Sequence, residues 1–134
     1  MTAPGILVDT YTWIEISRNS LWGQRALTWM EKNPAIFVSV LTLYELQYRF
    51  NDLYGEKKAS SFIATLLKHV EVIPVDQQIA TMAGVIKSRE KKNGSSMGAV
   101  DCMILATARV HGLKILSGDK HFAGLAECLE IHGS

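Results

Sequence analysis

The sequence contains few of the residues that mark several classes of protein. It has 134 residues, of which only two are cysteines (Cys102 and Cys128) and three are prolines. Two distant cysteines do not make the disulfide framework of a small secreted domain, so we expect packing roles for both in a reducing compartment. No apolar run has the length of a membrane span and no signal peptide is evident, which favours a cytoplasmic protein.

An excess of charge of either sign is also lacking. The formal net charge is +1, which gives no global argument for binding to nucleic acid or to an acidic surface. Any RNA-binding site must therefore come from a local patch. Arg89, Lys91 and Lys92 near the end of a predicted helix offer one. Two interpretations stand equally: a phosphate-binding patch, or a solvated helix end that complements the helix dipole.

Short apolar segments alternate with helical segments along the whole chain. Strands are predicted over 5–8, 36–38, 70–75, 113–116 and 129–131, and helices over 10–17, 21–32, 58–68, 77–92 and 99–111, with a further helix through Glu45 to Phe50 and a loop over 52–55. Short, continuously apolar strands between helices are typical of a parallel sheet covered on both faces. The sequence therefore predicts one α/β domain over residues 1–134.

Asp101 is the most conspicuous polar residue of the sequence. The predicted helix over 99–111 is apolar on most of its faces, and Gly112 is placed to end it. No lysine or arginine lies within one turn on the same face as Asp101. A buried, unpaired carboxylate costs several kcal/mol, so Asp101 is expected to be protonated, paired or bound to a cation.

Three more carboxylates are expected near the same edge of the sheet. Asp9 follows the first strand, Asp119 follows the fourth after two residues, and Glu45 lies in the helix after the second. Ligands of open α/β sheets bind outside the carboxyl ends of the strands. Two carboxylates about 5 Å apart repel by roughly 3 kcal/mol at an effective dielectric of 20. The cluster therefore predicts a divalent cation, and oxygen ligands favour Mg²⁺ or Mn²⁺.

Each of these residues taken alone also has a simpler interpretation. Asp9 can be the N-cap of the next helix, Thr42 and Glu45 match a capping box, and Asp119 suits an ordinary turn. Only the joint occurrence of the carboxylates favours a metal site. His121 is expected to be an exposed turn residue rather than a substrate contact, and no histidine has the spacing of a structural zinc site.

Four segments in order span nearly the whole chain. They are ILVDT (6–10), SVLTLYEL (39–46), DCMILATA (101–108) and ILSGDKHF (115–122). In order and spacing they resemble PIN-domain nucleases, and among these the VapC-type toxins of toxin–antitoxin pairs. The resemblance implies a PIN-like three-layer α/β/α sandwich with a mainly parallel sheet of four to five short strands.

The resemblance also implies a function and its residues. It implies cleavage of RNA with Mg²⁺ or Mn²⁺, a homodimer, and a cognate antitoxin protein that blocks the site. The implied catalytic and metal-binding residues are Asp9, Glu45, Asp101 and Asp119, with Ser117 and Thr10 as supporting residues. One departure is Tyr11, where many relatives carry a small polar residue: either Thr12 replaces it, or the metal is held more loosely.

Other classes of α/β protein fit less well. A receiver domain needs an acceptor aspartate after the third strand, where Asp76 is better explained as a helix N-cap. A haloacid-dehalogenase-type phosphatase needs a second aspartate two residues after Asp9, and Tyr11 stands there. The remaining alternative to an enzyme is a catalytically weak PIN module that acts mainly by binding protein or RNA.

Overall fold

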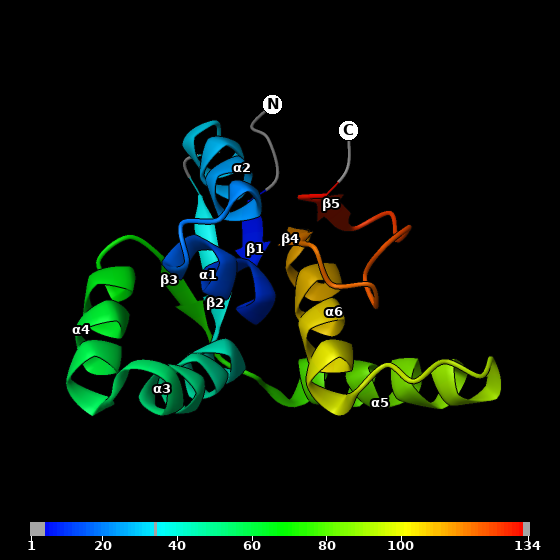
Figure 1. Ribbon diagram of the computed structural model, residues 1–134. Helices are drawn as coiled ribbons and strands as arrows, with labels where there is room; N and C mark the ends of the chain where they lie inside the picture. Colours follow the sequence, from blue (N-terminus) through cyan, green and yellow to red (C-terminus); the bar gives the residue numbers. More distant parts are fainter. Residues whose placement is uncertain (1–4, 34, 133–134) are drawn as a thin grey trace.

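The computed structural model describes residues 5–33 and 35–132, in which strands and helices alternate as predicted (Figure 1). The strands are β1 (Ile6–Val8), β2 (Ile36–Ser39), β3 (Glu71–Ile73), β4 (Lys114–Ser117) and β5 (Cys128–Glu130). The helices are α1 (Thr10–Ser17), α2 (Leu21–Glu31), α3 (Val40–Tyr54), α4 (Glu56–Leu67), α5 (Gln77–Lys92) and α6 (Ala99–His111).

The strands form one sheet in the order β3-β2-β1-β4-β5, and all four pairings are parallel. Side chains of successive strand residues point to opposite faces. In β1, Ile6 and Val8 pack into one hydrophobic core, and Leu7 packs into the other. Since the central strand is covered on both faces, its continuous apolar sequence is explained.

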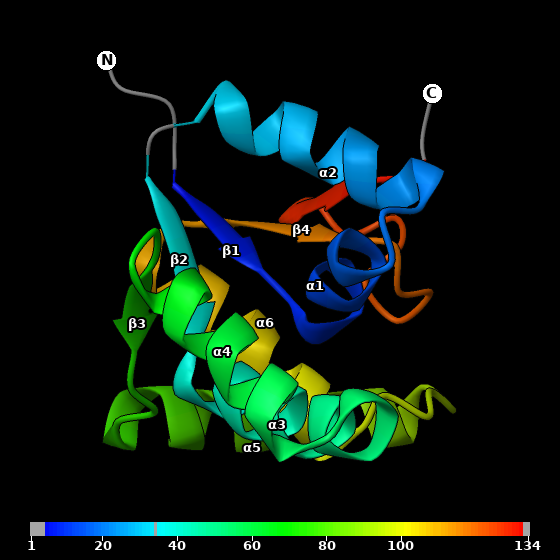
Figure 2. The same cartoon turned by 60° about the vertical axis from the view of Figure 1, so that its left-hand side comes forward.

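Helices cover the two faces of the sheet unequally. Residues of α1, α2, α3 and α4 build the core on one face, and residues of α5 and α6 build the core on the other. Figures 1 and 2 show these two groups of helices with the sheet between them. The predicted three-layer α/β/α sandwich with a parallel sheet is therefore confirmed.

The register of the two central strands fixes where the conspicuous polar residues meet. Val8 of β1 pairs with Leu116 of β4, so the next residues, Asp9 and Ser117, stand opposite each other at the carboxyl ends of the strands. Gly112 ends α6 in the left-handed conformation, with φ 64°, and thereby returns the chain to the sheet as β4.

Two local predictions have different outcomes. The loop predicted over 52–55 is wrong, because α3 continues to Tyr54 and only Gly55, with φ 87°, separates it from α4. The helix runs on through the exposed residues Leu53 and Tyr54, and the change of direction needs only the glycine. The cysteines agree with the prediction: Cys102 is buried, Cys128 is half-buried, and both are free.

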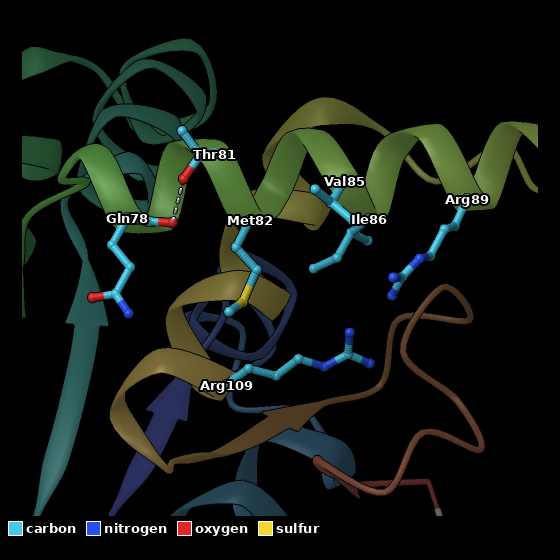
Figure 3. Close-up of a pocket in the computed structure, with 7 residues that line it drawn as sticks. All are labelled: Gln78, Thr81, Met82, Val85, Ile86, Arg89 and Arg109. Atoms are coloured by element: carbon cyan, nitrogen blue, oxygen red, sulfur yellow. Dashed lines mark hydrogen bonds between the residues drawn. The ribbon is translucent and has the colours of Figure 1, made fainter.

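Among the described residues, no hydrogen bond or ion pair joins the basic residues at the end of α5 to the carboxylates of the site. Arg89 lines a hollow between α5 and α6 together with Val85, Ile86 and Arg109 (Figure 3). The guanidinium of Arg109 is paired with Glu127, at 2.8 Å. Lys91 and Lys92 are exposed at the helix end. The hollow is thus lined by basic, neutral polar and apolar side chains, and no described carboxylate of the site contributes to it.

Among the described residues, no helix has both the length and the apolar character needed to cross a membrane.

Candidate functional site

Asp9 is held by neutral donors at the point where β1 becomes α1. It is the N-cap of α1, and its Oδ1 accepts hydrogen bonds from the backbone N–H of Thr12 at 3.1 Å and from the Thr12 hydroxyl at 2.8 Å. Its Oδ2 accepts a hydrogen bond from the Ser117 hydroxyl at 2.5 Å. Only 5% of Asp9 is exposed, and burial raises its pKa from 3.8 to about 7 against the opposing effect of these hydrogen bonds.

Ser117 links Asp9 to the loop after β4. While its hydroxyl donates to Asp9, the same oxygen accepts a hydrogen bond from the backbone N–H of Asp119 at 2.9 Å. Asp119 in turn accepts from the backbone N–H of His121 at 2.8 Å. Between them, a Cβ on Gly118 would come within 2.6 Å of the Tyr11 ring, so only glycine fits this tight loop.

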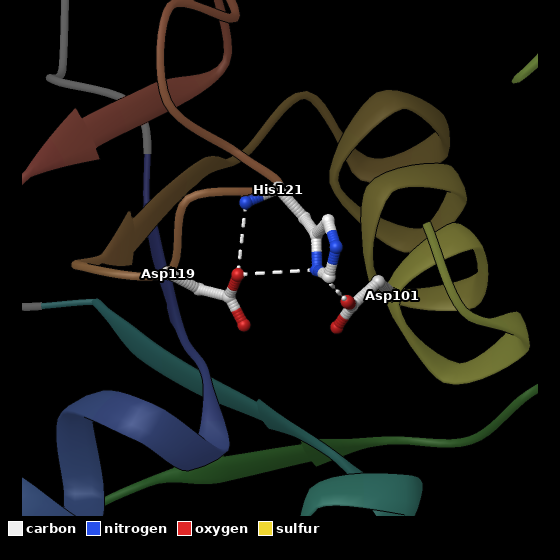
Figure 4. A group of neighbouring side chains, drawn as sticks. All are labelled: Asp101, Asp119 and His121. Atoms are coloured by element: carbon white, nitrogen blue, oxygen red, sulfur yellow. Dashed lines mark hydrogen bonds and ion pairs between the residues drawn. The ribbon is translucent and has the colours of Figure 1, made fainter. Parts of the chain in front are cut away.

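The loop brings His121 between two carboxylates (Figure 4). His121 Nδ1 lies 3.0 Å from Oδ2 of Asp101 and 3.3 Å from Oδ1 of Asp119. Burial raises the pKa of Asp101, the negative charges of Asp119 and Glu45 raise it further, and His121 opposes the shift. The side chain of Asp101 is 26% exposed, so it is less embedded than the apolar sequence of α6 indicated.

Sequence reasoning missed the place of His121. It was expected to be an exposed turn residue, but both ring nitrogens are shielded from solvent and neither makes a hydrogen bond within the described structure. The close approach of Nδ1 to two carboxylate oxygens therefore lacks hydrogen-bond geometry. The signal in the sequence was the Asp119-x-His121 spacing, because an Asx turn folds residue i+2 back against the aspartate.

Glu45 joins the group through Thr10. The Thr10 hydroxyl donates to Oε1 of Glu45 at 2.7 Å, which connects the start of α1 to α3. The capping-box interpretation of Glu45 is wrong: the N-cap of α3 is Ser39, whose hydroxyl accepts from the N–H of Leu41 at 3.1 Å. Thr42, the other residue of the supposed box, is buried and its hydroxyl has no partner within the described structure.

The positions after Asp9 explain the departure noted at Tyr11. The Thr12 hydroxyl donates to Asp9. The same hydroxyl oxygen also lies 2.7 Å from the carbonyl oxygen of Leu116. Tyr11 instead pairs its hydroxyl with Nε2 of His132, at 2.9 Å. Thr12 thus supplies a hydroxyl to Asp9, as the first of the two alternatives requires, while the Tyr11 ring lies beside Gly118 and its hydroxyl contacts His132.

The donors gathered here are of the kind that hold divalent cations. One ligand atom each from Asp101, Asp119 and His121 lie within 4.8 Å of one another. No described contact gives Asp9 a cationic partner, although it is almost completely buried. The neutral hydrogen-bond donors stabilise the negative charge of Asp9 only in part, and a bound cation would stabilise it further. Carboxylate oxygens suit Mg²⁺ and Mn²⁺, and an imidazole nitrogen is a common ligand of transition-metal ions.

Comparison with known proteins gives a consistent result. The toxin FitB of Neisseria gonorrhoeae is 26% identical over 122 residues, which cover 85% of this chain and 87% of FitB. A toxin–antitoxin complex from Klebsiella pneumoniae contains a similar fold, with a TM-score of 0.77, 23% identity, and coverage of 94% of this chain and 97% of that chain. VapC20 of Mycobacterium tuberculosis, a sarcin–ricin loop cleaving toxin, has a TM-score of 0.71 and 25% identity, and the match covers 91% of this chain and 97% of VapC20.

These relatives agree with the resemblance to VapC-type toxins that the four sequence motifs indicated. The family itself is established by a wider match, because the model of the PIN domain fits residues 6–127 and so includes every carboxylate of the site. The chain belongs to the PIN-domain family.

Proposed function

We propose that the chain is a metal-dependent endoribonuclease that hydrolyses RNA phosphodiester bonds, and that it is the toxin of a toxin–antitoxin pair. The observation that carries the proposal is one continuous set of contacts from Asp9 through Ser117, Asp119 and His121 to Asp101. Carboxylates from three separate parts of a PIN domain meet in this set, and Glu45 adjoins it through Thr10.

Each side chain has a distinct role in the proposed site. Asp9, Glu45, Asp101 and Asp119 are the catalytic and metal-binding residues, and Ser117 and Thr10 orient two of them. Ser117 fixes Oδ2 of Asp9, and Thr10 fixes Oε1 of Glu45. Because these carboxylates are already held by hydrogen bonds, little rearrangement is needed when a cation and the phosphate arrive.

The cofactor is proposed to be Mg²⁺ or Mn²⁺, held by the four carboxylates. Such an ion, when bound, supplies Lewis-acid activation of the attacking water and stabilises the negative charge that develops on the phosphate. Among the residues that the structure describes, Ser117 is not free to act as a nucleophile, because its hydroxyl is engaged by Asp9 and Asp119. Direct hydrolysis without a covalent intermediate is therefore the reaction that these residues support.

The partners follow from the same resemblance. The substrate is proposed to be RNA, and VapC20, one of the similar structures, is a sarcin–ricin loop cleaving toxin. A cognate antitoxin protein is proposed because similar folds occur in toxin–antitoxin complexes. The chain is proposed to act in the cytoplasm as a homodimer. Arg89, Lys91 and Lys92 remain proposed phosphate contacts for a long RNA that extends beyond the carboxylates along α5.

Sequencing of RNA 5′ ends after brief expression of the chain tests the activity. New ends at defined positions are expected for the wild type and not for Asp101→Asn. The purified protein should cleave the same RNA with Mg²⁺ or Mn²⁺, and EDTA should stop the reaction. Binding of RNA or antitoxin without any cleavage would instead support the alternative, a catalytically weak PIN module that acts by binding.

A further inference from the structure

His121 is the one nitrogen donor among the carboxylates that the described structure brings together. Its ring points into the space between Asp101 and Asp119 (Figure 4). Both of its nitrogens are shielded from water, and neither makes a hydrogen bond within the described residues. Shielded nitrogens without hydrogen bonds are uncommon in native structures, and each needs an explanation such as an absent ion.

The distances around Nδ1 fit a shared ligand sphere. Nδ1 is 3.0 Å from Oδ2 of Asp101 and 3.3 Å from Oδ1 of Asp119. Two donors at neighbouring positions of one six-coordinate ion are about 3 Å apart, because each metal–ligand bond is about 2.1 Å long. A simple charge pair explains the short distances as well, but it leaves unexplained why neither contact has hydrogen-bond geometry.

We propose that Nδ1 of His121 is a direct metal ligand beside Asp101 and Asp119, and that it makes the site select Mn²⁺ over Mg²⁺. The proposal rests on the metal site of the proposed function and adds to it a residue that determines which ion is held. The backbone supports the role, because the His121 N–H donates to Asp119 at 2.8 Å and holds the ring on the side of the carboxylates.

Selectivity follows from the chemistry of the donors. Mg²⁺ is a hard ion that prefers oxygen ligands and retains its waters, whereas imidazole suits transition-metal ions. A site of carboxylates alone offers both ions similar ligands. With one imidazole nitrogen added, the site gains affinity for Mn²⁺ and gains little for Mg²⁺.

The first experiment measures binding of Mn²⁺ and Mg²⁺ to untagged protein by titration calorimetry, at a pH above the ordinary histidine pKa. In the wild type, Mn²⁺ is expected to bind more tightly than Mg²⁺. In His121→Ala, the affinity for Mn²⁺ should fall about tenfold while that for Mg²⁺ changes little. His121→Gln, which offers an oxygen in place of the nitrogen, should lose the preference in the same way, and circular dichroism verifies that both variants fold.

The second experiment detects the nitrogen itself. Pulsed electron paramagnetic resonance of bound Mn²⁺ should show coupling to one ¹⁴N nucleus in the wild type and none in His121→Ala. His132→Ala is the matched control, because His132 approaches the same loop at Gly118 but pairs with Tyr11. The coupling should persist in that variant.

The outcomes separate this inference from the proposed function. Absence of nitrogen coupling in the wild type overturns the inference. An equal loss of affinity for Mn²⁺ and Mg²⁺ in His121→Ala overturns it as well. Tighter binding of both ions by His121→Ala also overturns it, since His121 would then be only a charge partner of the aspartates. If Mn²⁺ binds through nitrogen but no RNA is cut, the ligand assignment stands and the proposed function fails. If the wild type binds neither ion, both fail.

Discussion

Asp9 and Asp101 belong to the same chain of contacts, but their carboxyl groups differ in burial and in the residues that contact them. Asp9 is 5% exposed, and three neutral donors from Thr12 and Ser117 hold it in a fixed position. Asp101 is about a quarter exposed, and its contact is with a residue that can carry charge, His121. The contrast separates a carboxylate fixed by neutral hydrogen-bond donors from one that lies against an imidazole ring.

The difference shows how a cluster of carboxylates can fold before any metal arrives. Burial raises the pKa of Asp9 to about 7, so this residue can reduce the repulsion by holding a proton. The other pair can reduce it through the imidazole between Asp101 and Asp119. The proton on Asp9 and the imidazole beside Asp101 and Asp119 both lower the cost of bringing like charges together. A bound divalent ion can replace either of them.

The largest effect is expected when either Asp9 or Asp101 loses its charge, because both are proposed to belong to one metal site. Asp9→Asn and Asp101→Asn should each reduce RNA cleavage by at least about 100-fold, because the charge that stabilises the reacting phosphate is lost. Initial rates on a labelled RNA with millimolar Mg²⁺ or Mn²⁺ measure this. Full activity in either variant would show that the two regions do not act together.

The second prediction distinguishes Asp9 from Asp101 by the way stability depends on pH. The pKa of Asp9 is raised, so between about pH 4 and pH 7 the folded state holds a proton that the unfolded chain has released. The free energy of unfolding in EDTA should therefore fall as pH rises through this range, by up to about 4 kcal/mol from this group. Urea unfolding measures the slope.

Asp9→Asn should flatten that slope and should be more stable than the wild type near pH 8. Asp101→Asn should change it less, because burial of Asp101 is only partial. Equal slopes for the wild type and Asp9→Asn would contradict the raised pKa.

A third prediction concerns metal and thermal stability. An ion that binds only the folded state raises stability by about 2.7 kcal/mol at 100 times its dissociation constant. Millimolar Mg²⁺ should therefore raise the Tm of the wild type by several degrees, as differential scanning fluorimetry would show. The shift should disappear in Asp101→Asn. An unchanged Tm in the wild type would count against the metal site.

The smallest effect is expected from loss of the Ser117 hydroxyl, which joins Asp9 to the loop that carries Asp119. Ser117→Ala removes the donor to Asp9 and the acceptor of the Asp119 N–H, and should cost about 1–2 kcal/mol of stability by urea unfolding. Thr107→Val is the matched control, because its hydroxyl is also buried but donates to the Met103 carbonyl within α6. The control should leave the Mg²⁺-induced Tm shift intact, and Ser117→Ala should diminish it.

The elements and their order could be predicted because they depend on local patterns. The helix over 99–111 has the bounds of α6, and Asp76 caps α5 by accepting from the N–H of Ile79. Exposed segments were predicted less well: the continuation of α3 to Tyr54 was missed, because its apolar residues Leu53 and Tyr54 are exposed and do not extend a buried face. Burial of individual carboxylates was also misjudged, because it depends on which elements cover them.

By itself, the sequence determined that apolar strands would alternate with helices and that Asp9 and Asp119 would follow strand ends. These features depend on residues near one another in the chain. Only the tertiary structure decided which polar groups pair, because Ser117 and Asp9 are 108 positions apart and meet through the register of β1 and β4. It also placed His121 against Asp101, a contact that needs the loop after β4 to fold over the start of α6.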